Sequence, residues 1–222
     1  MALFGSRKND NTNNNNNTAA RVKQKTSEPT GNSTIITRGT HIEGTFTGND
    51  AITIDGKIVG DIKIKNNVIV STHGIVIGNI QAPKVICSGQ VEGNITCDHL
   101  EVLKSSILKS AIKADGVIVH GKIEGQIEAE NVNIELDGLV TDKIQAKNVN
   151  ISGTFDGSIA CDLLSTKGTA IVKGGIYVKN ISNQGGRIEG SIGQYRDVIG
   201  VDPEVTPKEE DKAESQDTTK SD

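Results

Sequence analysis

The hydrophobic residues of this 222-residue chain recur in a repeat that runs from about residue 35 to residue 195. Each repeat reads apolar–x–centre–x–apolar. The positions two residues before and two residues after the ten centres are apolar in all twenty cases. The centres, 15 to 18 residues apart and mostly glycine, are Gly44, Gly60, Gly78, Gly93, Ser110, Gly125, Asp142, Gly157, Gly174 and Gly190. A superperiod of 32 residues links Gly93, Gly125 and Gly157. Such recurrence predicts one winding of the backbone per repeat.

Apolar residues alternate with polar ones within each repeat, as around Ile58, Ile62 and Ile64. This period of two is typical of strands with one buried face, and the 3.6-residue spacing of an amphipathic helix is absent. A second β-branched run follows in most repeats, for example Ile52–Ile54. The pattern predicts an all-β fold, a parallel β-helix of about ten coils with two or three strands of about five residues each. At about 4.8 Å per coil, the rod would be roughly 45–50 Å long.

The composition fits a narrow interior. The chain has 25 glycines, only five aromatic residues and no Trp. Aromatic rings supply much of the buried area of an ordinary compact core, but stacked aliphatic columns inside a coil leave no room for them. Glycine at the repeat centre suits a corner of the coil, because a positive φ costs it no Cβ clash.

The flanks of the repeat have no apolar period. An Asn tract (Asn13–Asn17) lies in the first, and Pro, Glu, Asp, Lys, Ser and Thr dominate from Pro203 onward. We therefore expect disordered tails at residues 1–34 and 197–222 around a β-helix at residues 35–196. The net charge is −4, with a basic first tail and an acidic last one. The repeat region is slightly acidic and has few aromatic side chains, whereas nucleic-acid binding needs basic groups for phosphate and aromatic rings for the bases. We therefore predict that nucleic acid is not a partner.

No arrangement of residues typical of a catalytic, metal or cofactor site occurs in the sequence. The four histidines are scattered, and outward acids are interpreted as a solvated face. The histidines are His41, His73, His99 and His120, and the outward acids are Glu92, Glu124, Glu128 and Asp156. We predict a protein that is not an enzyme and that needs no cofactor, nucleotide included.

Three cysteines, Cys87, Cys97 and Cys161, show no C-x-x-C pair. Their odd number and low density are typical of reduced thiols in a cytosol. Cys97 and Cys161 fall in the same column, four coils or about 19 Å apart, so they cannot form a disulfide within one rod. We expect all three to be small buried core residues.

The stretches THIEGTFTGNDAITIDGKIVGDI, SGQVEGNITC and HGKIEGQIEAENVNI resemble the bactofilins, which are polymer-forming bacterial cytoskeletal proteins. The resemblance covers about residues 35–195 and is most specific in the D-G-K-I-x-G-D-I phrase at 55–62. It implies a right-handed, roughly triangular β-helix that polymerises end to end without nucleotide, often at the inner membrane. Ten coils exceed the family's usual core, which indicates a duplicated or extended core.

The resemblance also implies a role and partners. The role is in cell shape, polarity or the positioning of cell-wall enzymes, in the bacterial cytoplasm at the periphery of the inner membrane. The partners would be further copies of the chain, the lipid surface of the inner membrane, and cell-wall-modifying enzymes or other bactofilins.

The ends of such a rod present unpaired backbone groups over an apolar interior, which native proteins normally cover. The tails contain no amphipathic helix, so both ends should bind further copies of the chain. We predict a polymer interface formed by Ile42, Phe46, Ile188, Ile192 and Tyr195. Tails that fold over the ends as caps are the alternative.

The first residues combine apolar and basic side chains, and no stretch of the chain is long and apolar enough to predict a membrane-spanning helix. Met1, Leu3, Phe4, Arg7 and Lys8 resemble the short membrane-targeting starts of some bactofilins. One copy would bind weakly, and a filament with many copies would bind by avidity. An ordinary tail without affinity for lipid is the alternative.

A hexapeptide-type acyltransferase is the alternative reading for the whole chain. Such enzymes are left-handed β-helices with six-residue steps and a catalytic His. The uneven repeat of 15 to 18 residues and the scattered histidines favour the scaffold.

Overall fold

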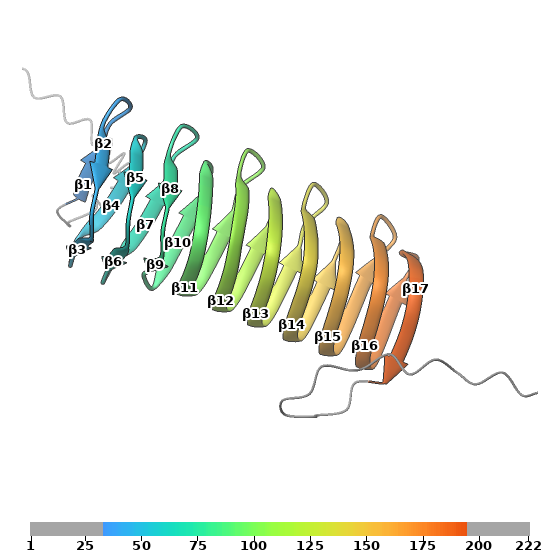
Figure 1. The fold of residues 1–222 in the computed structure, drawn as a ribbon. Helices are drawn as coiled ribbons and strands as arrows, with labels where there is room; N and C mark the ends of the chain where they lie inside the picture. The colour runs from blue at the N-terminus through green and yellow to red at the C-terminus, as the bar shows by residue number, and fades with distance from the viewer. Residues whose placement is uncertain (1–32, 195–222) are drawn as a thin grey trace, which may run out of the picture. The chain divides into compact units, whose positions relative to one another are not determined.

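The computed structural model describes residues 33–194, and every helix or strand in that range is a β-strand. The strands wind into a solenoid of ten coils, which confirms the predicted all-β fold (Figure 1). The two predicted disordered tails lie outside the described residues, apart from Ser33 and Thr34. The right-handed winding implied by the family resemblance stays a prediction.

Each coil has three faces, which we name A, B and C in chain order. The first coils are built from separate strands of two to four residues. They are β1 (Ser33–Ile36), β2 (His41–Glu43), β3 (Phe46–Gly48), β4 (Ala51–Ile54), β5 (Lys57–Val59), β6 (Ile62–Ile64), β7 (Asn67–Val70), β8 (Ile75–Ile77), β9 (Ile80–Gln81) and β10 (Lys84–Cys87). Face A begins with β1, face B with β2 and face C with β3.

In the later coils, strands on successive faces join into one long element that bends round the corners. These elements are β11 (Gln90–Val102), β12 (Ile107–Val119), β13 (Lys122–Ile134), β14 (Leu139–Ile151), β15 (Thr154–Lys167), β16 (Ile171–Gln184) and β17 (Arg187–Gln194). The predicted strand length of about five residues was therefore wrong. Pairing between neighbouring coils continues through the corner, as at Gly125 and Asp142, so the ladder does not break there.

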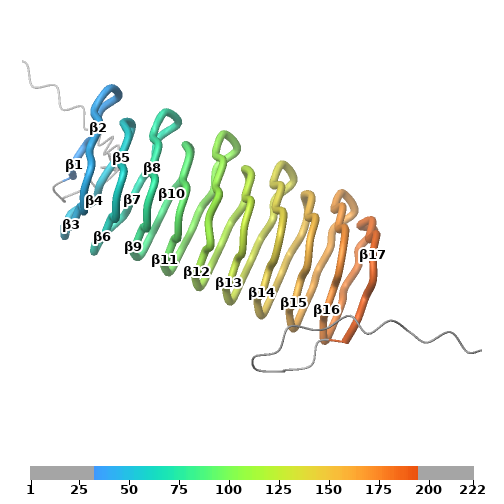
Figure 2. Tube along the Cα trace, viewed as in Figure 1, coloured from blue at the N-terminus to red at the C-terminus, as the bar shows by residue number. Residues whose placement is uncertain are grey.

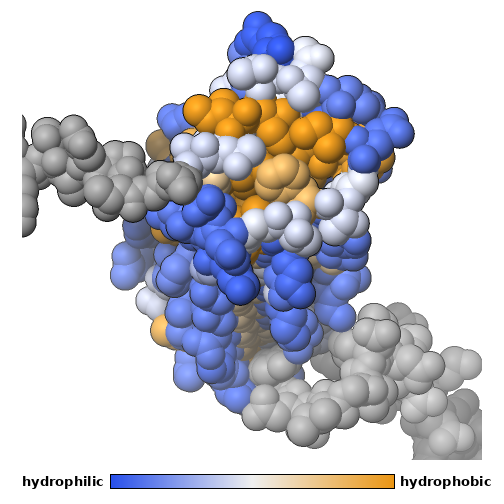
Figure 3. All heavy atoms as spheres, turned by 90° about the vertical axis from the view of Figure 1, so that its left-hand side faces the viewer, coloured by the Kyte–Doolittle hydropathy of each residue, from blue (hydrophilic) through white to orange (hydrophobic). Residues whose placement is uncertain are grey.

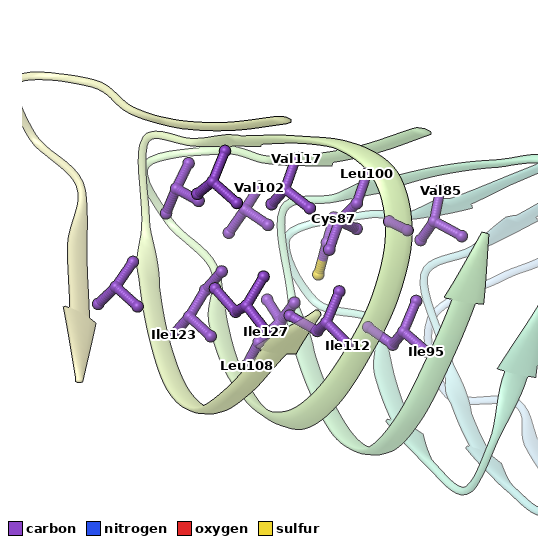
Figure 4. Close-up of a cluster of buried hydrophobic side chains, with 14 of the residues drawn as sticks. Val85, Cys87, Ile95, Leu100, Val102, Leu108, Ile112, Val117, Ile123 and Ile127 are labelled. Atoms are coloured by element: carbon purple, nitrogen blue, oxygen red, sulfur yellow. The ribbon is translucent and has the colours of Figure 1, made fainter. Parts of the chain in front are cut away.

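All strand pairings are parallel and in register from coil to coil, which confirms the predicted columns. On face B, for example, Ile42 pairs with Ile58, and Ile58 pairs with Val76. The inward side chains of the three faces form one continuous hydrophobic core (Figure 4). Phe155 is the one aromatic side chain that is fully buried among the described residues. The interior is thus almost entirely aliphatic, as the composition predicted.

The corner between faces B and C requires glycine for two reasons. The eight central glycines have φ between 109° and 151°, a range that L side chains rarely adopt. In addition, a Cβ on Gly157 would overlap the carbonyl oxygen of Asp142 in the coil before it. Asp142 itself has a φ of 99°. Ser110 is the exception, because it has no positive φ and its buried hydroxyl has no hydrogen-bond partner among residues 33–194.

The corner between faces A and B alternates between a long and a short form, which explains the 32-residue superperiod. The long corners protrude on every second coil (Figure 2). Each is closed by a backbone hydrogen bond that spans three residues: Thr40 to Thr37, Gly74 to Ser71, Ser106 to Leu103, Gly138 to Glu135 and Ala170 to Lys167. Two consecutive coils are therefore the true structural repeat.

Candidate assembly interface

The first coil exposes apolar side chains that belong to the interior columns. Ile42 and Phe46 are half-buried, whereas Ile58 and Ile62, their partners in the next coil, are buried. Figure 3 looks at this end of the solenoid and shows hydrophobic residues gathered together with hydrophilic ones around them. The difference arises because the described residues place no coil in front of the first one.

The last described coil has the same property at the opposite end. Ile188 is half-buried and Ile192 is 57% exposed, whereas Ile176, one coil earlier in the column of Ile192, is 0% exposed. Ile181, an inward residue of the last face A strand, is 41% exposed. Tyr195, the remaining residue of the predicted polymer interface, lies outside the described residues.

Both ends also present strands that are paired on one side only. β1 pairs with β4, β2 with β5 and β3 with β6, and β17 pairs with β16. Within residues 33–194, no strand covers their outer sides. Gly44 shows the same openness, because a Cβ there would meet nothing within 4 Å, while every other glycine of its column would clash with the preceding coil. Each end can therefore accept another strand layer.

The four described residues of the predicted interface thus fall into two sets. Ile42 and Phe46 lie together at one end, and Ile188 and Ile192 lie together at the other. Neither set is a site within one chain. They form two end surfaces, each with an apolar centre and, within residues 33–194, free strand edges beside it. At the last coil, the inward columns also include the polar Asn183 and Gln194.

The histidines and acids singled out from the sequence do not gather into one site. His41 contacts Glu43 at 3.0 Å, and His73 contacts Asp55 at 3.3 Å together with Arg38. His99 and His120 lie on other coils. Glu124 pairs with Lys122 at 2.6 Å, which lowers the pKa of Glu124 through a hydrogen bond and the nearby positive charge. Among residues 33–194, no group of three or more His, Cys, Asp or Glu side chains could hold a metal ion.

All three cysteines are buried, free thiols. Burial raises the pKa of Cys87, Cys97 and Cys161 to about 12, so the nucleophilic thiolate is scarce at neutral pH. Cys97 and Cys161 share a column, with Ala114, Ala129 and Ala146 between them. That register confirms the predicted separation of four coils. The groove over this column has a volume of about 780 Å³, and its lining contains no histidine.

Sequence reasoning missed the contacts that join coils on the outside. Stacked amides form ladders, with Asn131 accepting from Asn148 at 3.0 Å and Asn133 accepting from Asn150 at 2.8 Å. Ion pairs also span coils, such as Lys104 with Asp137 at 2.6 Å. The repeated N-V-N-I of residues 131–134 and 148–151 was the available signal for the amide ladders.

The described part of the chain is therefore a parallel β-solenoid whose interior columns remain open at both ends. Among residues 33–194 there is no helix that could cross a membrane. A fold of this class gains its stability from stacking between neighbouring coils, and its open ends suit it to stacking between molecules.

Comparison with known proteins agrees with this class. The sequence profile of the family described as "Bactofilin: Polymer-forming cytoskeletal" matches twice, at residues 34–120 and 113–193. Because these matches cover more than half of the chain, the chain belongs to the bactofilin family, a structural family of the bacterial cytoskeleton. The acyltransferase alternative is not favoured. Two matches that overlap only at residues 113–120 agree with the expectation of a duplicated or extended core.

One curated relative is bactofilin BacP from Myxococcus xanthus (strain DK1622). It is 29% identical to this chain over 76 residues, which is 34% of the chain. The match spans 32% of the relative's own length. No solved structure matches the chain.

Proposed function

We propose that this chain is a nucleotide-independent scaffold that polymerises end to end through its terminal coils. One observation carries the proposal: inward columns that are sealed inside the solenoid reach both ends uncovered, as the 0% exposure of Ile176 and the 57% exposure of Ile192 show. Burying an aliphatic side chain stabilises a contact by about 1.5–3 kcal/mol. Stacking would also pair the free edges of β1–β3 and β17.

A charge at either end tests this proposal. Phe46→Asp and Ile192→Asp each place a carboxylate in the apolar centre of one end, where burial without a partner is costly. We expect both variants to sediment as small species where the unmodified chain forms polymer. Thr47→Asp is the matched control, because Thr47 is exposed beside Phe46 and points outward. Full polymer from both Phe46→Asp and Ile192→Asp would refute end-to-end stacking.

We also propose that the filament lies on the cytoplasmic side of the bacterial inner membrane. Met1, Leu3, Phe4, Arg7 and Lys8, all outside the described residues, would supply the contact. Each basic residue adds about 1 kcal/mol on anionic lipid, so one chain binds weakly and a filament binds by avidity. A variant that lacks residues 2–8 should lose co-sedimentation with anionic vesicles while it still polymerises. Unchanged co-sedimentation would contradict the membrane role of this segment.

A filament at the membrane would provide an extended platform. We propose, from the family resemblance, that it contributes to cell shape or polarity by positioning cell-wall-modifying enzymes or other bactofilins. Deletion of the gene should then alter cell shape, and the Ile192→Asp variant should fail to restore it. If the Ile192→Asp variant fully restores cell shape, the cellular role does not require polymerisation.

A further inference from the structure

Face A carries a row of isoleucines on its outer side. Ile35, Ile69, Ile86 and Ile118 occupy one outward column in coils one, three, four and six. Ile35 is 64% exposed and Ile118 is 40% exposed, and the other two are half-buried. We call these four residues the isoleucine row. Thr53 and Glu101 fill the column in coils two and five.

The same column changes character in the last four coils. There it consists of polar residues: Asn133, Asn150, Ser165 and Ser182. Backbone pairing is the same along face A, and its inward residues stay aliphatic and buried from coil six through coil eight, so the fold does not demand isoleucine in the first six coils. An outward isoleucine gains nothing from the core, and several of them gathered on one face are a feature of surfaces that bind a partner.

Face B has no comparable surface. In one outward column of face B, apolar residues follow the long corners and alternate, coil by coil, with polar or charged ones. The other outward column has Val59 and Ile77 in consecutive coils and only polar or charged residues in the remaining described coils. The order along the first of these columns is His41, Lys57, Ile75, Gln90, Ile107, Lys122, Leu139, Thr154, Ile171 and Arg187. With four isoleucines in six consecutive coils, the isoleucine row is therefore the column of these two faces that is richest in outward apolar residues.

The charges around the row indicate what covers it. Among the outward residues of face A in coils one to six, the titratable groups are Lys84, His99 and Glu101. Lys84 and Glu101 lie in adjacent coils and have no ion pair with the described residues. The surface thus has one lysine against one glutamate, which offers little attraction to an anionic membrane. It suits a second copy of itself, because opposite charges can meet across a two-fold axis.

We propose that the isoleucine row is a lateral contact through which two filaments of this chain pair face to face. Flat sheets pack in this way about 10 Å apart. Six coils of a four-residue strand offer on the order of 400 Å² per chain, which is below the roughly 800 Å² per partner of a stable complex. Single chains therefore do not pair. A filament repeats the contact in every subunit, so avidity stabilises the pair. The proposal rests on end-to-end assembly.

The test compares two double variants in the same column. Ile69→Lys with Ile86→Lys places charge in the row, and Asn133→Lys with Asn150→Lys places the same charge in its polar continuation. All four positions face outward, so both variants should fold. In negative-stain micrographs we expect paired filaments from the unmodified chain and from the asparagine variant, and single filaments of similar length from the isoleucine variant.

Other outcomes overturn the proposal, each in a distinct way. Single filaments from the unmodified chain, or paired filaments from the isoleucine variant, would overturn the lateral contact and leave end-to-end assembly intact. If the isoleucine variant keeps its pairing and instead loses co-sedimentation with phosphatidylglycerol vesicles, the row binds lipid and the proposal is wrong. Absence of filaments from the unmodified chain would overturn both end-to-end assembly and the lateral contact.

Discussion

The inner coils and the terminal coils have aliphatic side chains in most of the same columns but different surroundings, and two of the columns end on the polar Asn183 and Gln194 in the last described coil. Ile176 and Ile192 occupy one column in consecutive coils, and only the first is sealed. Gly174 and Gly190 would both clash with the preceding coil if they carried a Cβ, whereas Gly44 has open space. The same unit is therefore complete when it has two neighbours and incomplete when it has one. Polymerisation would supply the missing neighbour.

The largest effect is expected from a charge inside the stack. Ile123→Asp would place a carboxylate at a fully buried position with no partner, and such a change costs more than about 4 kcal/mol. We expect loss of the β-sheet signal in circular dichroism. Ile192→Asp at the open end should keep that signal and lose only polymer in sedimentation. Equal loss of structure in both variants would remove the distinction between inner and terminal coils.

Glycine replacement gives the next largest effect. Gly157→Ala would meet the Asp142 carbonyl and a φ of 151°, at a combined cost of about 2–6 kcal/mol. Gly44→Ala would introduce the strain of a positive φ without a clash, which should lower the free energy of unfolding by about 1–3 kcal/mol. Urea unfolding of the two variants, each in the Ile192→Asp background to keep them from polymerising, measures the difference. Similar midpoints would show that the preceding coil does not restrict the corner.

The thiols provide a smaller effect that depends on pH. Burial raises the pKa of Cys87, Cys97 and Cys161 from 9.0 to about 12. The unfolded thiols ionise first, so their contribution to stability is complete below about pH 9 and is lost as pH rises towards 12. At pH values between about 9 and 12, a thiol reagent should modify the three buried thiols of the folded protein slowly.

An Ile192→Cys variant sharpens this comparison between coils. It is made in the Phe46→Asp background, which keeps another chain from stacking over the terminal coil. The added thiol would then lie where Ile192 is 57% exposed, and it should react with the reagent much faster than the three native thiols. Comparable rates for all four cysteines would indicate that the inner coils open readily.

The smallest effect concerns Asp142, which holds a φ of 99° in a column of glycines. Asp142→Gly removes the strain of that conformation, and the gain is partly offset by the greater freedom of glycine in the unfolded chain. We expect a net stabilisation of up to about 1 kcal/mol in urea unfolding. Gly125→Asp, at the equivalent corner of the preceding coil, should be destabilised. Destabilisation of Asp142→Gly would point to an unrecognised role for the carboxylate.

The interior was predictable from sequence because each column imposes one simple condition. An inward position such as Ile58 must be apolar, and a corner such as Gly60 must tolerate a positive φ and a close carbonyl. Repetition over ten coils makes both conditions visible. Strand length was not predictable, because it depends on whether pairing continues round a corner, as between Gly125 and Asp142.

The candidate assembly interface was only partly predictable. The apolar columns predict Ile42, Phe46, Ile188 and Ile192, because these residues belong to the first and last repeats, which have a neighbouring repeat on one side only. The isoleucine row was not recognised, because alternation alone does not reveal that Ile69 and Ile86 face outward in the same column. That requires the register between coils.

The most direct test of end-to-end assembly is the length of filament that each chain occupies, measured by cryo-electron microscopy without added nucleotide. Ten coils at about 4.8 Å predict about 48 Å of filament for each chain in a single strand, with the 4.8 Å spacing along the filament axis. Rods that lie across the filament axis would contradict the account, because the 4.8 Å spacing would then run perpendicular to the filament.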